Sequence, residues 1–384
     1  MGDTNNSKPV AAKKPRKYVA DWRIPHRRSV EPRDIPTLEE AKAIIDRLYE
    51  SGVPFFTKEL IQDMWDQTKR EPTPDKIITK DITGATVRCN VEMGRVCRMR
   101  DAEDDTELMY VCKDLALNYN CRAHLTNEID RRHFSLSHWE PCSVIIMHKT
   151  QKLDSKTKEI VPQRGPLDRE VVAKIFHDKT QEWKESPACE KLKTILSSSA
   201  KDHEINKVVA FALGTMSFQH FNEEGILDTS YGWRSAFQNA LLVTITEWLK
   251  ERDHKEKVPC YSQDPAQSEV DKEILDEVGI EVVDDPRGWL EVDEQSVVFS
   301  VAPNVPVKEI ITDIARPAII IWCRVKFLDG LDQRCTDPDS SRVRAMMEGY
   351  ELYEFGPDQN IFCDLAIYIR KLVAAPTPSD GRFS

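Results

Sequence analysis

No run of about 18 apolar residues occurs in this chain of 384 residues, which excludes a membrane-spanning helix. The first residues also lack the apolar segment of a secretory signal, so we expect a cytoplasmic protein that could also enter the nucleus. In such a reducing compartment the ten cysteines are expected to be free thiols. Apolar residues still make up 40% of the chain, which is enough to build a hydrophobic core.

A basic face is missing from most of the chain. Residues 1–33 hold nine Lys or Arg and three Asp or Glu, so they carry +6, and the remainder carries −17 of the total charge of −11. General nucleic-acid binding needs a basic surface and is therefore not expected. The Lys13–Lys17 stretch is either a nuclear-import signal or part of a solvated leader. We expect residues 1–36 to be a disordered basic tail and residues 371–384 to be a flexible tail.

Residues 37–200 are expected to form a mixed α+β extension. Thr37 and Glu40 have the spacing of a capping box, which predicts a helix that ends near Gly52, and Thr57 is expected to open a second helix. Further along, the pattern predicts short strands at 85–89, 109–112 and 143–148, a long turn at 149–160, a helix capped by Asp168, and a linker at 197–206.

From residue 207 onward, short apolar runs alternate with amphipathic segments. This alternation is typical of a parallel sheet with helical crossovers, so we predict an α/β fold with a Rossmann-like, mainly parallel core over residues 203–370. The predicted strands are 208–214, 258–261, 280–285, 297–303 and 318–323, with an antiparallel strand at 288–292 and edge strands at 350–355 and 361–369. The predicted helices are 235–250, 269–278 and 307–314.

Several short motifs in this core occur in a recognisable order. They are Phe211–Ser217 (FALGTMS), Arg234–Gln238 (RSAFQ), Gln263–Pro265 with Glu269, and the turn from Leu275 to Gly279. Together they resemble the sensitivity-to-red-light-reduced (SRR-like) domain family over roughly residues 203–326. The resemblance implies a regulatory protein linked to light and circadian signalling, or to the control of haem (tetrapyrrole) biosynthesis, with no firmly attached chemical activity.

The chain departs from the family pattern at two strand ends. Where the family has a Pro-His-Cys motif after its fourth strand, this chain reads Ala302-Pro303-Asn304-Val305. Where the family's fifth strand ends in Asn-Ser-Phe, this chain has Trp322-Cys323-Arg324. Any activity that needs the family's imidazole or thiol at the first place is therefore in doubt.

Polar side chains follow the predicted strands at the edge where parallel sheets bind ligands. The candidates are Gly214, Thr215, Ser217, Gln238, Asp264 and Asn304, with Arg324 at the same edge. A small residue after the first strand and an acid after the second resemble a site for a nucleotide or S-adenosylmethionine, and residues 218–233 could form a lid. Only one glycine is present, however, and the acid lies 50 residues past it, so a standard dinucleotide fingerprint is not expected. Asp264 could equally close a turn with Pro265.

Metal ligands and nucleophiles are not arranged in a diagnostic pattern. Seven Cys or His residues fall between Cys112 and His148, and the weak zinc candidates among them are Cys121, His124, His138 and Cys142. Cys-x-x-Cys pairs are lacking, so no metal is expected. A Gly-x-Ser-x-Gly elbow is absent too.

Three hypotheses follow, and the third is a zinc-dependent N-terminal module that uses the cysteines and histidines between Cys112 and His148. In the first, the chain is a regulatory protein that works through unidentified protein partners, without a membrane and without a certain cofactor. In the second, it is a Rossmann-like enzyme that binds S-adenosylmethionine or a nucleotide at the edge formed by Gly214 and Asp264.

Overall fold

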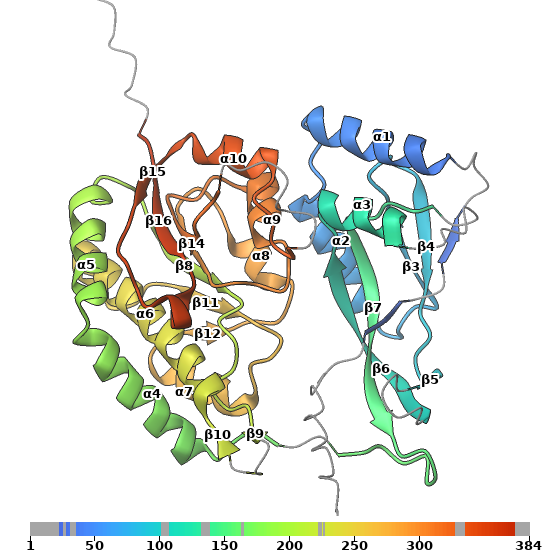
Figure 1. Ribbon diagram of the computed structural model, residues 1–384, viewed down its shortest axis with the longest axis horizontal. Helices are drawn as coiled ribbons and strands as arrows, with labels where there is room; N and C mark the ends of the chain where they lie inside the picture. Colours follow the sequence, from blue (N-terminus) through green and yellow to red (C-terminus); the bar gives the residue numbers. More distant parts are fainter. Residues whose placement is uncertain are drawn as a thin grey trace, which may run out of the picture.

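The computed structural model describes residues 23–25, 28–30, 36–100, 107–131, 139–162, 165–221, 225, 227–326 and 335–372. Two bodies are visible in Figure 1, one formed by the described residues up to about 160 and one by the described residues after them. Among the described residues, no helix combines the length and apolar character needed to cross a bilayer.

A seven-stranded sheet forms the centre of the larger body, in the order β12-β11-β8-β13-β14-β16-β15. Its strands are β8 (Lys207–Phe211), β11 (Cys260–Gln263), β12 (Glu281–Val282), β13 (Ser296–Ser300), β14 (Ile319–Cys323), β15 (Tyr350–Tyr353) and β16 (Leu365–Arg370). The five strands from β12 to β14 are parallel, whereas β16 runs antiparallel to both of its neighbours. The predicted Rossmann-like, mainly parallel α/β core is confirmed.

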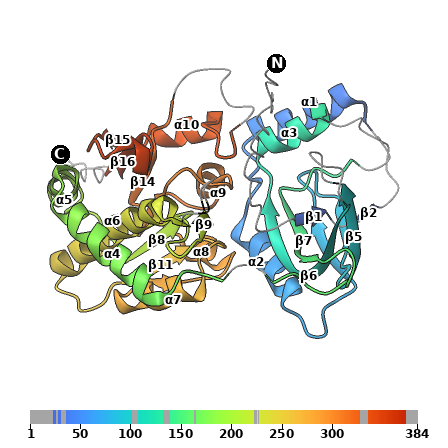
Figure 2. The same cartoon turned by 60° about the horizontal axis from the view of Figure 1, so that its bottom comes forward.

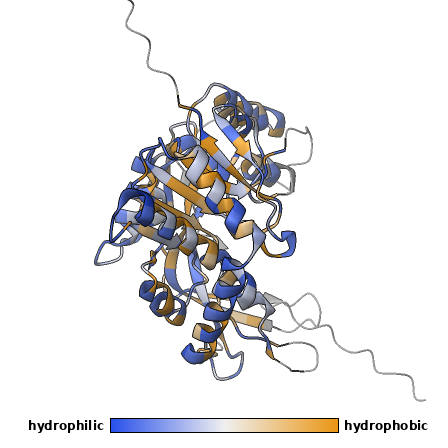
Figure 3. Cartoon of the chain, turned by 90° about the vertical axis from the view of Figure 1, so that its left-hand side faces the viewer, coloured by the Kyte–Doolittle hydropathy of each residue, from blue (hydrophilic) through white to orange (hydrophobic). Residues whose placement is uncertain are grey.

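Each face of this sheet contributes to a different hydrophobic cluster. One face is covered by α4 (Arg169–Lys184), α5 (Pro187–Ser199), α6 (Ser230–Asp253) and α7 (Glu269–Glu277), visible on the outer side of the sheet in Figure 2. The other face holds the short helices α8 (Arg287–Glu291), α9 (Val307–Ile314) and α10 (Ser341–Met347). The four-residue α11 (Gln359–Phe362) precedes β16. Coloured by hydropathy, the helices carry both hydrophilic and hydrophobic stretches, as expected for helices that pack on a core with one face (Figure 3).

The described residues up to about 160 form the smaller body, which we call the N-terminal module. Its helices are α1 (Leu38–Glu50), α2 (Lys58–Thr68) and α3 (Arg122–Arg131). One of its sheets holds β1 (Arg23–Pro25), β7 (Val144–Leu153), β6 (Glu107–Tyr119) and β5 (Val96–Arg100), and the other holds β2 (Arg28–Val30), β4 (Thr86–Asn90) and β3 (Lys76–Lys80). In addition, β9 (His220–Phe221) and β10 (Leu227–Asp228) form a small hairpin in the larger body.

The N-terminal module shares a hydrophobic core with the second face of the central sheet. Phe56 and Ile61 of the module fall in one cluster with Phe211 of β8 and Trp322 of β14. The short helices α8 and α9 leave much of this sheet face uncovered, and the module covers it instead. The module and the larger body are therefore stabilised by one another, because neither surface is buried without its partner.

Several local predictions hold. The capping box of Thr37 and Glu40 is present, and Thr57 accepts the amide hydrogen of Leu60 at the start of α2. The predicted helix at 307–314 coincides with α9. These features depend on residues within one helical turn of each other, which is why the local pattern suffices.

Other local predictions are wrong. The segment 288–292, expected as an antiparallel strand, lies mostly in helix α8, where Gly288 donates to Gln263 Oε1 of β11 at 2.6 Å. Residues 197–199 of the expected linker complete α5, and Asp168 precedes α4 without a side-chain capping bond. Strand β7 extends to Leu153, into the expected turn, because β6 pairs with it along its length.

The predicted extension and the two predicted tails have limits that can be set beside the described elements. Helices α4 and α5, placed by the prediction in the extension, pack in the same cluster as α6 and the central sheet. Within the expected basic tail, β1 pairs with β7 and β2 pairs with β4. Residues 373–384 of the expected C-terminal tail lie outside the described residues.

Candidate functional site

The carboxyl ends of the parallel strands form the candidate site. Strand order along the sheet reverses between β8 and β13, because the chain moves from β8 to β11 and β12 on one side and from β13 to β14 on the other. In open α/β sheets ligands bind outside the strand ends at this point of reversal. The loop after β8 begins here with Ala212, Leu213 and Gly214.

Gly214 and Asp264 meet at this edge, as predicted. The Gly214 amide donates to Asp264 Oδ2 at 2.7 Å, and the Ala266 amide donates to Asp264 Oδ1 at 2.9 Å. Asp264 therefore closes its own turn and also holds the loop after β8. Burial raises the pKa of the Asp264 carboxyl above its usual value, and the two amide donors partly oppose that rise.

A glycine is required at position 214. Its φ angle is +70°, a conformation that other residues rarely adopt, and an added Cβ would lie 2.6 Å from Ser235 Oγ of α6. The sequence suggests that a small residue here admits a ligand. In the structure, the space above Gly214 is taken by the first turns of α6.

Asp271 organises the rest of the loop, a role that the sequence analysis missed. Its carboxylate, fully buried, accepts hydrogen bonds from Thr215 Oγ1 at 2.6 Å, Ser217 Oγ at 2.8 Å and the Met216 amide at 2.8 Å. Its Oδ2 also accepts the Ser268 amide, which completes the capping box of α7. The capping spacing of Ser268 and Asp271 was visible in the sequence, but the long-range bonds to Thr215 and Ser217 were not.

The other predicted ligand residues are dispersed. Gln238 lies in α6 and donates through Nε2 to the Ile361 carbonyl at 2.8 Å. Asn304 is exposed after β13, and Arg324 after β14 pairs with Glu354 and Asp364. Of the six ligand candidates, only Gly214, Thr215, Ser217 and Asp264 are joined through hydrogen bonds to one another or to Asp271.

The predicted lid at 218–233 contains the β9–β10 hairpin and the start of α6. His220 Nδ1 lies 3.4 Å from Asp228 Oδ2 across this hairpin. Residues 222–224 and 226 lie outside the described residues. Helix α6 begins at Ser230, five residues before the predicted start, and this shortens the segment available for a lid.

A second group of polar side chains lies beyond the ends of β13 and β14. Lys308 is buried at the start of α9, with its Nζ 2.5 Å from Asp339 Oδ1 and 3.8 Å from Asp337 Oδ2. Burial raises the pKa of Asp337 to about 7, and Lys308 opposes this rise. Burial alone would lower the pKa of Lys308, but the two carboxylates raise it, so its ammonium stays charged.

The next residue of α9 links the larger body to the N-terminal module. Glu309 is 3% exposed, and its Oε1 accepts a hydrogen bond from Tyr49 Oη of α1 at 2.9 Å. The Arg122 amide donates to Glu309 Oε2 at 3.3 Å. Burial raises the pKa of Glu309, and these donors oppose the rise. The strand-end side of α9 is thus occupied by the module.

The metal candidates do not form a site among the residues that the structure describes. Cys121 and Cys142 are buried, and burial raises the pKa of the Cys121 thiol. His138 lies outside the described residues. In the described part of the chain, no group of three or more His, Cys, Asp or Glu side chains is placed to hold a metal ion.

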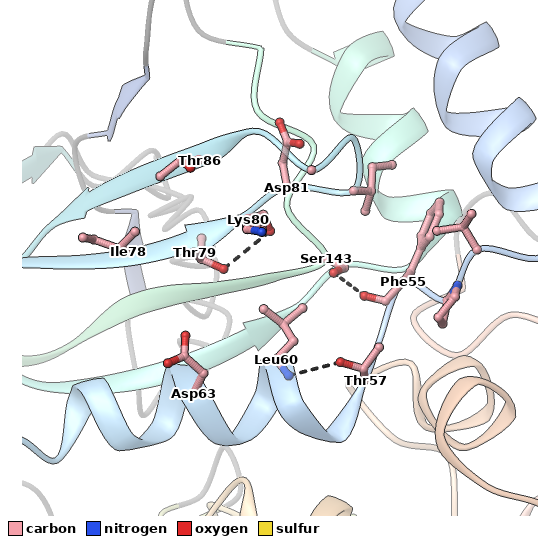
Figure 4. A pocket seen from close by; sticks show the side chains of 14 residues that line it. Phe55, Thr57, Leu60, Asp63, Ile78, Thr79, Lys80, Asp81, Thr86 and Ser143 are labelled. Carbon is pink, nitrogen blue, oxygen red and sulfur yellow. Dashed lines mark hydrogen bonds between the residues drawn. The ribbon is translucent and has the colours of Figure 1, made fainter.

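A cavity of about 470 Å³ lies in the N-terminal module between α2 and the β3–β4 hairpin (Figure 4). Its polar groups take part in local bonds: Thr57 caps α2, Ser143 Oγ donates to the Phe55 carbonyl, and Asp81 Oδ1 accepts the Thr83 amide. Leu60 and Ile78 supply apolar lining. The residues described around this cavity bond mostly to their own neighbours, and the cavity supports no specific chemistry.

Comparison with known proteins gives one match. A family model described as the SRR1 domain matches residues 172–369. No curated protein and no solved structure matches the chain. The matched segment starts in α4 and ends within β16, so it includes all seven strands of the central sheet apart from Arg370, and it is longer than the segment expected from the motifs.

Proposed function

Because this chain belongs to the SRR1 domain family, with residues 172–369 forming the domain, we propose that it is a regulatory protein that acts through protein partners rather than by catalysis. Its process would be the control of haem (tetrapyrrole) biosynthesis or light and circadian signalling, the two roles that the family resemblance implies.

One observation carries this proposal. The polar side chains that a Rossmann-like enzyme would direct at a ligand are here bonded within the protein. Asp264 holds the Gly214 amide, and Asp271 holds Thr215 and Ser217. A site for substrate needs polar groups that converge on open space, whereas these groups converge on each other.

The experiment compares a deletion strain with strains complemented by the wild type or by a variant of the strand-end network. The variant is Thr215→Val, which removes one hydroxyl from the network and leaves the Asp271 carboxylate with its other donors. We expect altered haem and precursor levels, or an altered light-dependent rhythm, in the deletion strain. The wild type should restore them, and so should Thr215→Val if this edge serves structure. Unchanged haem, precursors and rhythm in the deletion strain would contradict the regulatory role.

Binding of S-adenosylmethionine or a nucleotide is the second candidate. It is favoured by the strand order, which brings Gly214 and Asp264 together beside the point of reversal. Asn304 is the variant to use here, because it is exposed after β13 and its loss should not affect folding. If the site binds such a ligand, saturation at 100 times the dissociation constant should add about 2.7 kcal/mol to the free energy of unfolding.

Thermal unfolding with S-adenosylmethionine, ATP, NAD and protoporphyrin separates the two candidates. An S-adenosylmethionine- or nucleotide-dependent rise in melting temperature that Asn304→Ala reduces would favour the enzyme. The absence of any rise with S-adenosylmethionine, ATP or NAD would leave the regulatory proposal standing. Protoporphyrin is included because a response to it alone would support a link to haem synthesis.

A further inference from the structure

A second cavity, of about 710 Å³, lies at the amino end of β14, whereas Gly214 and Asp264 follow the carboxyl ends of β8 and β11. Strand β16 runs antiparallel to β14, with Ile369 opposite Ile319, so Arg370 at the end of β16 lies where β14 begins. The cavity is lined there by the end of α9, the end of α10 and the last residues of β16. Gly52 and Pro54 of the N-terminal module complete it.

The lining is strongly basic, although the protein as a whole carries −11. It contains Arg316, Arg342, Arg370 and Lys371, and a single acidic residue, Asp313. Arg342 Nη1 pairs with Asp313 Oδ1 at 2.9 Å. Asp313 Oδ2 is also engaged, because it accepts the Phe55 and Phe56 amides. One cation of the four is therefore neutralised inside the cavity.

The other three cations contact only main-chain carbonyls within the described part of the chain. Arg316 donates to the Ala315 carbonyl at 2.9 Å and also to the Thr312 carbonyl, and Arg370 donates to the Arg316 carbonyl. Lys371 Nζ donates to the Glu348 carbonyl at 2.8 Å. These bonds fix the positions of the side chains but leave their positive charge without a carboxylate partner.

The positive charge of these side chains also acts on Tyr350, which lines the cavity. Tyr350 is buried, with its hydroxyl donating to the Pro317 carbonyl at 2.8 Å. Burial raises the pKa of the phenol, whereas Arg370 and Arg316 oppose the rise and Glu294 adds to it. Both arginines and the buried Tyr350 line the same cavity.

We propose that this cavity binds a small anionic ligand that carries a phosphate or diphosphate group. Guanidinium groups match phosphate oxygens with paired hydrogen bonds, and three cations without a carboxylate partner would be compensated by such a group. The volume lies within the range of about 300–1,000 Å³ found for small-molecule sites. The site needs the SRR1 domain and the loop between α1 and α2 together, and it is independent of the strand-end site.

The test titrates the full chain with sodium pyrophosphate, ADP and citrate at constant ionic strength, followed by calorimetry and by melting temperature. The test variant is the double substitution Arg316→Gln with Lys371→Gln. Both side chains are exposed and should leave the fold intact. The matched control is Lys191→Gln with Lys257→Gln, which removes the same charge from exposed positions in α5 and in the loop before β11.

We expect saturable binding of pyrophosphate, weakened at least tenfold in the test variant and unchanged in the control. Tighter binding of ADP than of pyrophosphate would identify the ligand as a nucleotide, and equal binding would identify the phosphate group alone. The proposal is overturned if pyrophosphate does not bind, if citrate binds as tightly, or if the control weakens binding as much as the test variant does.

Discussion

Substituting Asn for Asp271 removes one oxygen from the carboxylate that holds the loop after β8. In the wild type, Oδ2 accepts from Thr215, Ser217 and Ser268, while Oδ1 accepts the Met216 amide at 2.8 Å. An asparagine that keeps its oxygen at the Oδ2 position turns its amide group toward the Met216 amide. Two donors then face each other in a place with no access to water.

The magnitude follows from these contacts. A buried donor left without an acceptor costs about 1–3 kcal/mol, and the three remaining bonds also lose the strength that the negative charge gave them. We expect Asp271→Asn to lower the free energy of unfolding by about 2–4 kcal/mol. This is a large part of the 5–15 kcal/mol that is usual for a folded protein.

The assay is urea denaturation, with Asp276→Asn as the matched control. Asp276 is in the same helix, α7, but is exposed, so the same chemical change there should alter stability by less than about 0.5 kcal/mol. The midpoint of the transition should fall for Asp271→Asn with its slope unchanged. Equal midpoints for the two variants would refute the role assigned to Asp271.

Three further outcomes are expected. Gly214→Ala should destabilise the protein by about 1–3 kcal/mol more than Gly94→Ala in thermal unfolding. Both glycines have a positive φ angle, but only at Gly214 would the added Cβ lie within 3 Å of a side chain. An equal loss of stability in the two variants would exclude crowding at Gly214. Burial raises the pKa of Asp337 from 3.8 to about 7, so the native state binds this proton more tightly than the unfolded state does. The stability that protonated Asp337 contributes is therefore complete below pH 3.8 and is lost as the pH rises through 7. In a series of unfolding free energies measured at different pH values, Asp337→Asn should reduce this loss of stability with rising pH. Tyr49→Phe removes a buried hydroxyl that donates to Glu309 of α9, and it should lower the free energy of unfolding by about 1–3 kcal/mol in urea denaturation. The control Tyr353→Phe, at a more exposed position, should lower it by less than about 0.5 kcal/mol. Similar losses in both variants would contradict a stabilising link between the module and the larger body.

The organisation of the central domain could be predicted from the sequence because its signals are local. Apolar runs of five or six residues indicate buried parallel strands, and the spacing of Ser268 and Asp271 indicates the start of a helix. The alternation of strands and helices then restricts the sheet to a Rossmann-like arrangement, and the motif order indicates the SRR-like family. Both predictions are confirmed, and Gly214 and Asp264 do meet at one edge.

The sequence pattern predicted the wrong secondary structure where a contact between residues far apart in the chain determines it. The segment at 288–292 reads as a strand, but Gly288 and Trp289 are held in a helix, the first by Gln263 and the second by stacking on Phe211 at 3.9 Å. In the same way β7 continues through an expected turn because β6 pairs with it. Such contacts join residues far apart in sequence, and no short window contains both partners.

The sequence by itself determined which residues could build the strand-end site, and only the tertiary structure decided what they bond to. Asp264 and Thr215 are chemically able to hold a ligand, but the fold places them against a backbone amide and against Asp271. The basic cavity is decided in the same way, because Arg316 follows the end of α9 and Arg370 ends β16, and nothing in the sequence indicates that they lie close together. The physical reason is that a hydrogen bond or a charge acts over a few ångströms of space, whatever the separation along the chain.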